Sequence, residues 1–317
     1  MTEASRPPAS VTSGILLIDK PQGLTSHDVV SRTRKAAGTR KVGHAGTLDP
    51  MATGLLVLGL NSSTRLLTYL VGLDKEYFAT IRLGQSTTTD DAEGETVTSH
   101  TVAEVTETMI LAGVLALTGE ISQIPSSVSA IKVDGKRAYA LVRAGETVEL
   151  KAREVTISAF DVLETRAITE ADDSFIDIDV RVECSSGTYI RALARDLGSG
   201  LGVGGHLTAL RRTKVGPFSV ADAATLERLA PSEQLLAPSL VAATLFPTYW
   251  ADTQEVIDLV HGKRIGAPGL PSTRGPIAII APDGRLVGLA KATSSGAQPL
   301  VNFPTDEILD KKVHDDD

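Results

Sequence analysis

The chain contains very little cysteine and no long hydrophobic run. A single cysteine, Cys184, occurs among 317 residues, which excludes an intramolecular disulfide and any multi-cysteine metal site and fits a reducing compartment. Residues 1–12 form a loose polar tail without the pattern of a signal peptide, and apolar runs such as 55–60 are too short to span a bilayer. These absences predict a cytoplasmic protein that does not associate with membranes.

Sequence motifs for common cofactors are absent as well. The chain has no Gly-x-x-x-x-Gly-Lys-Ser/Thr phosphate loop and no His-Glu-x-x-His zinc helix. The acidic segment 90–94 lacks the spacing of a calcium loop, and no pair among the six histidines has metal-ligand spacing. We therefore expect a mechanism that uses side chains alone, without metal or cofactor.

Charge is unevenly distributed along the chain. The net charge of −8 argues against a bulk nucleic-acid binder. Residues 83–131, however, hold seven acids and no lysine or arginine, whereas 29–48 hold no acid and five basic residues: Arg32, Arg34, Lys35, Arg40 and Lys41. A solvated helix surface also explains such a basic cluster. If the two signs lie on different faces, one face is positive although the whole chain is acidic.

Strands and helices follow one another without regular alternation. Residues 14–18, 77–83, 154–164 and 175–184 read as strands, and 26–37, 102–117 and 188–197 as helices. Ser26 is the expected N-cap and Gly38 the expected stop of the first helix. The order predicts an α+β fold with a mixed, largely antiparallel sheet and flanking helices.

We expect four parts along the chain. A disordered tail (1–12) precedes a large domain (13–240), from which residues 124–152, rich in proline, serine, glycine and basic residues, make an ordered excursion. A smaller domain (245–308) follows, in which glycines separate short apolar runs as in a small β-barrel. Residues 309–317 form an acidic tail.

The segment 43–54, Gly-His-Ala-Gly-Thr-Leu-Asp-Pro-Met-Ala-Thr-Gly, places one carboxylate in a glycine-rich loop after the most basic part of the chain. Proline restricts the preceding Asp49 to an extended conformation, and Gly43 and Gly46 allow a ligand to approach the backbone. Asp-Pro is also a common helix start with the aspartate as N-cap, here opening a short apolar turn that runs to Gly59. The two roles are compatible, and an acid beside a cationic surface suggests chemistry on an anionic polymer.

Four strings, in this order and spacing, resemble the bacterial tRNA pseudouridine synthase B (TruB) family. They are Lys-Pro-Gln-Gly-Leu-Thr-Ser at 20–26, the loop 43–54, Lys-Glu-Tyr at 75–77 and Gly-Thr-Tyr-Ile-Arg-Ala-Leu at 187–193. Supporting strings occur at 125–139 and 210–212, and the similarity covers residues 14–217. It implies a pseudouridine synthase-like fold with a C-terminal PUA-like RNA-binding barrel, although the barrel region itself resembles the family only weakly.

The resemblance implies that the protein converts the uridine at position 55 in the T loop of tRNA to pseudouridine, without metal or cofactor. The reaction breaks the C1′–N1 bond, turns the uracil and joins C1′ to C5, after the base has been flipped out at a cost of about a few kcal/mol. Asp49 is implied as the essential carboxylate. Attack on C1′, attack on uracil C6 and a glycal-like intermediate all remain open.

The resemblance also assigns residues around Asp49. A buried carboxylate needs a charged partner, and Arg191 matches the family's arginine that pairs with it. Taken alone, Arg191 would be interpreted as a surface arginine on a helix. Tyr77 matches the tyrosine that stacks on the flipped base, and Tyr189 and Leu210 match positions that line the pocket. Without the motifs, a tyrosine at a strand start and a leucine in a helix are usually core residues.

Three further residues complete the implied site. His44 matches a histidine that enters the loop beside the extruded nucleotide, and Asp91 an aspartate that organises the arginine. Lys20 is either structural or in contact with RNA. The family's acidic loop reads Arg-x-Asp-Thr-x-Asp, whereas this chain has Ser-Thr-Thr-Thr-Asp-Asp at 86–91, so one arginine and one acid of the expected charge network are missing.

Contacts to RNA are expected on three segments, where phosphate contacts would position the RNA without reading its sequence. The first is the basic cluster 32–41, and the second is the excursion, which by resemblance closes over the T arm. The residues in the excursion are Lys132, Lys136, Arg137 and Arg143. The third segment contains Arg211, Arg212 and Lys214.

Three functional hypotheses follow. The first is a stand-alone tRNA pseudouridine synthase that acts as a monomer and needs no guide RNA or protein partner. The second is an RNA-folding chaperone that binds and opens tRNA, a role that a synthase can also have. The third is a guide-dependent synthase subunit that needs partner proteins; the compact C-terminus and the resemblance to the bacterial form argue against it.

Overall fold

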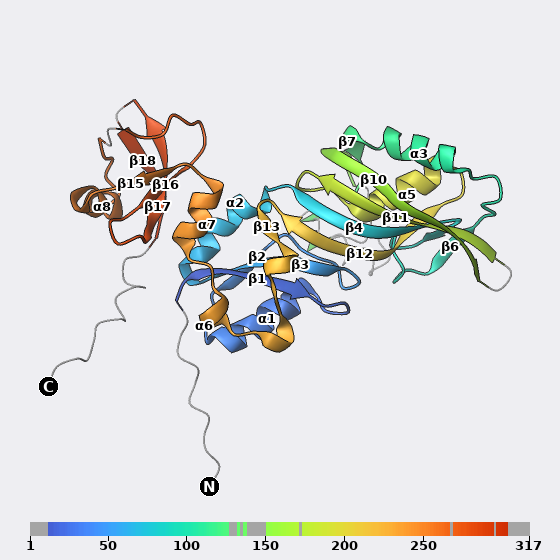
Figure 1. The fold of residues 1–317 in the computed structure, drawn as a ribbon, viewed down its shortest axis with the longest axis horizontal. Coiled ribbons are helices and arrows are strands. Elements are labelled where there is room, and N and C mark those ends of the chain that lie inside the picture. Colours follow the sequence, from blue (N-terminus) through green and yellow to red (C-terminus); the bar gives the residue numbers. More distant parts are fainter. Residues whose placement is uncertain are drawn as a thin grey trace, which may run out of the picture. The chain divides into compact units, whose positions relative to one another are not determined.

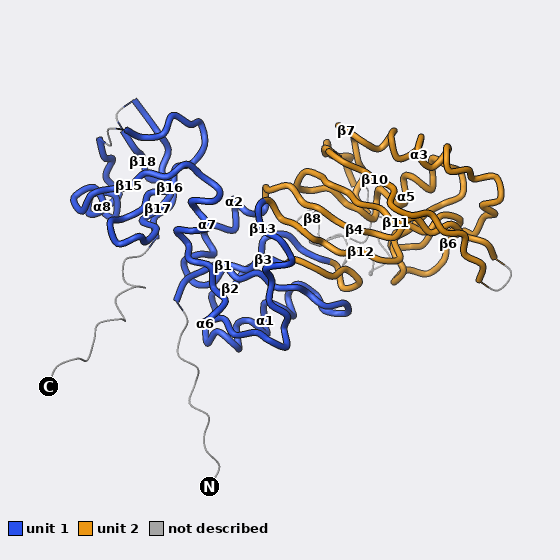
Figure 2. The backbone as a smooth tube through the Cα atoms, viewed as in Figure 1, with its two compact units in different colours: residues 1–48, 56–71, 217–317 blue, residues 49–55, 72–216 orange. Residues whose placement is uncertain are grey.

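The computed structural model describes residues 12–126, 132–133, 136–137, 150–170, 173–266, 269–294 and 296–303. It divides into two compact units (Figure 2). Unit 1 comprises residues 1–48, 56–71 and 217–317, and unit 2 comprises residues 49–55 and 72–216. None of the helices in the described ranges combines the length and apolar composition that crossing a bilayer requires.

The N-terminal part of unit 1 packs a helix on a small group of strands. Its elements are β1 (Gly14–Lys20), α1 (Ser26–Ala37), β2 (Val42–Ala45), the second half of β3 (Thr53–Leu60), the 3₁₀ helix η1 (Asn61–Leu66) and α2 (Leu67–Val71). The buried face of α1, with Val29 and Val30, packs on Leu16, Ile18 and Leu58 of the strands. Short elements complete the group: β14 (Ala224–Thr225), η2 (Val220–Asp222), η3 (Leu226–Arg228) and α6 (Pro231–Gln234).

Helix α1 confirms its predicted extent but corrects its predicted cap. The N-cap is Thr25, whose hydroxyl accepts from the Asp28 amide while the Asp28 carboxylate accepts from the Thr25 amide, a capping box. The hydroxyl of Ser26 instead bonds to the backbone N–H and C=O of Leu48, at 2.8 and 3.1 Å. Gly38 ends the helix as predicted, at a φ of 62°.

The C-terminal part of unit 1 is a four-stranded sheet with helices beside it. Helix α7 (Pro238–Leu245) precedes β15 (Thr248–Trp250), α8 (Thr253–Val260), β16 (Ile277–Ile280), β17 (Leu286–Thr293) and β18 (Gly296–Asn302). The strand order is β15-β16-β17-β18, with β15 parallel to β16 and the other pairs antiparallel. Over the described residues this sheet is open, so the structure does not show the predicted small β-barrel as closed: glycine-separated apolar runs indicate short strands but do not determine whether the first and last strands pair.

Unit 2 is built on a larger sheet. Its strands are the first residues of β3, then β12 (Gly205–Val215), β4 (Lys75–Leu83), β11 (Asp173–Cys184), β10 (Arg153–Glu170) and β7 (Gly119–Gln123), in that spatial order. Strand β12 runs parallel to β3, and the remaining neighbours are antiparallel. The mixed, largely antiparallel sheet predicted for an α+β fold is confirmed.

Helices and small strand pairs cover this sheet. Helix α5 (Ile190–Gly200) packs on β12 and β4, and α3 (Glu107–Ala116) packs on α5 and β10 (Figure 1). The pair β5 (Gln85–Thr87) and β6 (Thr96–Ser99) flanks the loop 88–95, and β13 (Phe218–Ser219) pairs with β12. Within the predicted excursion, β8 (Lys132–Val133) pairs with β9 (Lys136–Arg137).

The two faces of strand β4 differ in character. Tyr77, Ala79 and Ile81 are buried on one face. On the opposite face, Glu76 pairs with Arg181 at 2.9 Å, and Arg82 pairs with Asp177 of β11 at 2.8 Å. Because side chains alternate along a strand, β4 separates a buried face from a face whose acids are paired with arginines.

Candidate active site

Asp49 lies just before strand β3 in unit 2. The chain turns there through a hydrogen bond from the Ala52 amide to the Asp49 carbonyl, at 3.1 Å, and β3 begins at Thr53. No helix starts at Asp49, so the expectation of a helix-capping aspartate, and of an apolar turn running to Gly59, is wrong. The apolar residues after the loop form a buried strand, because a strand covered on both faces reads as a continuous apolar run rather than an alternating one.

The Asp49 carboxylate pairs with Arg191 of helix α5. The guanidinium Nη2 lies 3.0 Å from Asp49 Oδ2 and Nη1 lies 3.3 Å from Asp91 Oδ2, while Nη1 also donates to the Thr89 carbonyl at 2.9 Å. The Arg191 side chain is 5% exposed, Asp91 3% and Asp49 36%. One buried cation therefore joins a buried carboxylate to a partly exposed one, and of the two the Asp49 carboxylate is the one accessible from solvent.

Hydroxyl groups of the loop 87–91 hold Asp91 in place. The Thr89 hydroxyl donates to Asp91 Oδ1 at 2.5 Å, the Glu93 amide donates to the same oxygen at 3.1 Å, and the Thr87 hydroxyl donates to the Asp91 carbonyl at 2.7 Å. The missing arginine and acid of the family pattern correspond to Ser86 and Thr88, whereas Thr89, which the pattern shares, and Thr87 hold Asp91. Asp91 meets Arg191, as the resemblance implies.

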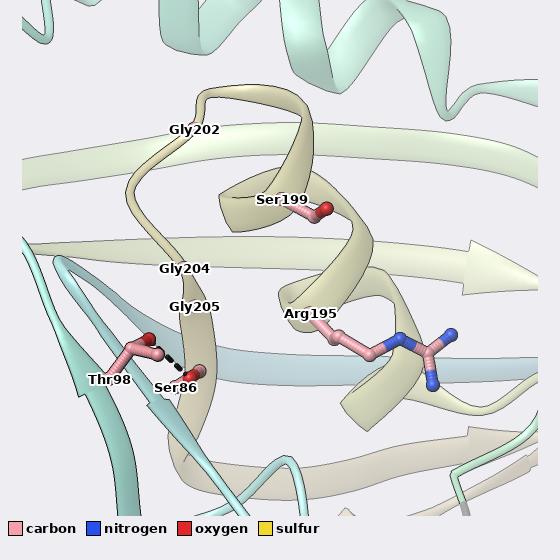
Figure 3. Close-up of a pocket in the computed structure, with 7 residues that line it drawn as sticks. All are labelled: Ser86, Thr98, Arg195, Ser199, Gly202, Gly204 and Gly205. Atoms are coloured by element: carbon pink, nitrogen blue, oxygen red, sulfur yellow. Dashed lines mark hydrogen bonds between the residues drawn. The ribbon is translucent and has the colours of Figure 1, made fainter.

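The departure at Ser86 borders a shallow pocket (Figure 3). Its hydroxyl lies 2.6 Å from that of Thr98, and the pocket, of about 320 Å³, is also lined by Arg195, Ser199 and three glycines of the loop after α5. The Arg195 guanidinium pairs with Asp90 at 3.3 Å and with Asp196 at 2.8 Å. Arg195 and Arg191, one helical turn apart on α5, therefore contact neighbouring aspartates of the same loop.

Tyr77 lies on β4 directly opposite Arg212 of β12, which in turn lies opposite Gly54 of β3. Burial raises the pKa of the Tyr77 phenol; a hydrogen bond and the positive charge of Arg212 oppose this, and the charge of Asp49 adds to it. The phenol is therefore protonated at neutral pH. Leu210, also buried, lies opposite Ala79, two positions along β4 on the Tyr77 face. It is in a strand, not in the predicted helix.

The sequence analysis missed the role of Arg212. Its side chain is 1% exposed and its Nε donates to the Leu55 carbonyl at 2.7 Å, so it does not lie on a surface that RNA could contact. Neighbouring Arg211 is half-buried, and Lys214 is exposed and 3.2 Å from Glu76. The alternation of side chains along a strand was the signal that could have revealed this burial. Consecutive side chains point to opposite faces of a sheet, so two consecutive arginines do not share one solvent-exposed face.

The remaining predicted residues are placed in other parts of the chain. In unit 1, Lys20 is fully buried and donates to the Leu24 and Pro21 carbonyls at 2.7 and 3.0 Å, and His44 is half-buried in β2. Tyr189, half-buried, directly precedes α5 in unit 2. Arg34 is half-buried, and the other basic residues of that cluster are exposed: Arg32, Lys35, Arg40 and Lys41. The side chains of Lys132, Lys136, Arg137 and Arg143 lie outside the described part of the chain.

Comparison with solved structures defines the class of protein. The chain superimposes with a TM-score of 0.68 and 26% identity on a protein chain in "Structure of H/ACA RNP bound to a substrate RNA containing 2'-deoxyuridine", over 93% of this chain and 86% of that one. Models for a "TruB family pseudouridylate synthase (N terminal domain)" and two TruB C-terminal domains match residues 34–190, 191–247 and 246–304. The fold is that of a pseudouridine synthase.

Sequence relatives narrow this class. The chain is 60% identical to the tRNA pseudouridine synthase B of Leifsonia xyli subsp. xyli, over 94% of this chain and 99% of the relative. It is 51% identical to the protein of the same name from Streptomyces griseus, over 96% of this chain and 100% of the relative. The chain belongs to the TruB family of pseudouridylate synthases, which are isomerases.

Proposed function

We propose that the protein isomerises the uridine at position 55 in the T loop of tRNA to pseudouridine, with Asp49 as the essential carboxylate. The observation that carries this proposal is the pair of Asp49 with Arg191, in which the cation is buried and the carboxylate is open. The tRNA substrate class is taken from the relatives, which are named tRNA pseudouridine synthase B. Lysine and arginine side chains would position the RNA, and the flipped base would lie beside Asp49.

The chemistry needs only groups that the chain supplies. The C1′–N1 bond breaks, uracil turns, and C1′ joins C5; the C5 proton is released and N1 gains one, so no co-substrate is consumed. Arg191 keeps the Asp49 carboxylate oriented through their ion pair. The candidate routes are attack of Asp49 on C1′, attack of Asp49 on uracil C6, and a glycal-like route that Asp49 assists.

Tyr77 offers a flat, buried ring beside the carboxylate. We assign it to stacking on the flipped uracil, with Tyr189 and Leu210 as further walls of the pocket and His44 as a group that positions the loop. Flipping costs about a few kcal/mol, which contacts to the tRNA backbone offset. We assign those contacts to the exposed residues Arg32, Lys35, Arg40, Lys41 and Lys214, and remove the buried Arg212 from this set.

The domain roles are part of the same proposal. Residues 13–240 would carry the reaction, and residues 245–308 would add RNA contacts. We expect the protein to act as a monomer without guide RNA or partner proteins, in the cytoplasm.

The deciding experiment measures tritium release from tRNA labelled at uracil C5. We expect release by the wild type and none by Asp49→Asn, with tRNA affinity changed by less than about tenfold because binding rests on phosphate and base contacts. The matched control is Asp179→Asn. Asp179 is also an arginine-paired carboxylate, 33% exposed beside Arg166, but lies on the ion-paired face of the sheet, so this variant should keep its activity.

Each other outcome would contradict part of this proposal. Release by Asp49→Asn at the wild-type rate would remove Asp49 from the reaction. Joint loss of affinity and stability in Asp49→Asn would give this residue a structural role. Tight binding without release by the wild type would favour the RNA chaperone over the synthase.

A further inference from the structure

Helix α5 carries Arg191 in its first turn but begins without a capping side chain. The residue before the helix, Tyr189, makes no side-chain cap hydrogen bond. The first amides of a helix need acceptors from outside it, and a serine, threonine, aspartate or asparagine usually supplies one. The start of the helix that holds Arg191 must therefore be fixed in another way.

Gln123, at the end of strand β7, contacts both polar groups of the Tyr189 backbone. Its Oε1 accepts from the Tyr189 amide at 2.8 Å, and its Nε2 donates to the Tyr189 carbonyl at 3.1 Å. That carbonyl also accepts the first helical hydrogen bond, from Leu193 at 3.2 Å. Gln123 is 2% exposed, so its side-chain amide bonds to these two backbone groups of Tyr189 rather than to solvent.

A second contact joins the same two elements. Arg195 of α5 donates from Nη2 to the carbonyl of Ile124, the residue after Gln123, at 2.7 Å. The end of β7 is itself held in the sheet, where Gln123 pairs with Arg153 of β10. Helix α5 is thus fixed to the sheet at its first turn through Gln123 and one turn later through Arg195.

We infer that Gln123 is a positioning residue for the reaction, acting through Tyr189 and Arg191. This inference rests on the proposed role of the Asp49–Arg191 pair. Arg191 follows Tyr189 by two residues, and its guanidinium must reach Asp49 and Asp91 at the same time. A small displacement of the first turn of α5 lengthens both ion pairs and moves Tyr189 within the pocket, and a misplacement of about 1 Å is enough to cost on the order of 100-fold in rate.

The test uses Gln123→Met in the full chain, since methionine has a similar length and cannot make either hydrogen bond. We expect the single-turnover rate of tritium release to fall by about tenfold to 100-fold, while the Kd for tRNA stays within about threefold of the wild type. In an Arg191→Lys background the same substitution should cost less than about threefold, because residues that act through one another are not additive.

Gln234→Met is the matched control. Gln234 also makes two hydrogen bonds to backbone groups, one with Ala230 and one with Arg228, each at 2.8 Å, but it belongs to unit 1. This variant should keep the wild-type rate. If Gln123→Met does not fold, Gln123→Glu, which keeps the shape and the acceptor oxygen, is judged by the same criteria.

Amide hydrogen exchange of residues 190–193 in the free protein separates this inference from the proposed function. Faster exchange in Gln123→Met supports the fixation of α5 whatever reaction the enzyme catalyses. Unchanged exchange, a wild-type rate of release, or an equal loss in the Arg191→Lys background would overturn the positioning role. Absence of release by the wild type would instead refute the proposed reaction.

Discussion

Replacing Arg191 with methionine should destabilise the protein mainly through Asp91 rather than Asp49. Asp91 is 3% exposed and would keep its bonds from Thr89 and Glu93 but lose the positive charge of Arg191, which lies 3.3 Å away. Removing one partner of a buried ion pair costs roughly 3–5 kcal/mol. The more exposed Asp49 adds at most about 1 kcal/mol. We therefore expect a total loss of about 3–6 kcal/mol, most of it through Asp91.

A second substitution tests this assignment. Asp91→Asn in the Arg191→Met background removes the buried negative charge and keeps an acceptor oxygen for the two remaining donors, so it should restore about 2 kcal/mol. Urea unfolding followed by circular dichroism measures both variants, with Arg166→Met as control. Arg166 is 35% exposed, so its loss should cost under about 1 kcal/mol. The reasoning is refuted if the double variant is less stable than Arg191→Met, or if Arg166→Met costs as much.

Three other predictions concern the backbone, a buried amine and the RNA surface. Gly54→Ala should lower stability by about 2 kcal/mol or more, because the φ of Gly54 is 100° and the new Cβ would lie 2.2 Å from a backbone oxygen of β12. Gly119→Ala is the control, with a φ of 95° and open space around it, and it should cost less in the same thermal melts. Burial lowers the pKa of Lys75 from 10.5 to about 8. Between these pH values the unfolded state binds more protons than the folded state, so the free energy of unfolding should rise with pH, by roughly 3 kcal/mol in total. Lys75→Met should lack this rise in urea unfolding. Gln at both Arg40 and Lys41 should weaken tRNA binding and reduce the slope of log K against log salt by about 1 to 2, and an unchanged slope would place these side chains away from the RNA.

Much of the local structure was predictable from the residues themselves. The extent of helix α1 and its stop at Gly38 follow from apolar spacing and a left-handed glycine, and the paired strands β10 and β11 follow from their patterns. The predicted cap at Ser26 was wrong by one residue, because the neighbouring Thr25 forms a capping box and Ser26 is drawn to the backbone of Leu48. Strand β3 was missed because its burial on both faces removes the alternation that marks a strand.

The sequence by itself determined the family and, through the resemblance, the candidate residues of the site. The loop around Asp49 and the segment around Arg191 are continuous motifs, which can be recognised without knowing what they contact. The tertiary structure decided the contacts that no motif implied. It turned Arg212 inward against Tyr77 and brought Gln123 to the start of α5. These contacts join segments that are distant in the sequence, and they depend on the face that each side chain occupies. Strand pairing and packing together set that face, and no local sequence pattern contains this information.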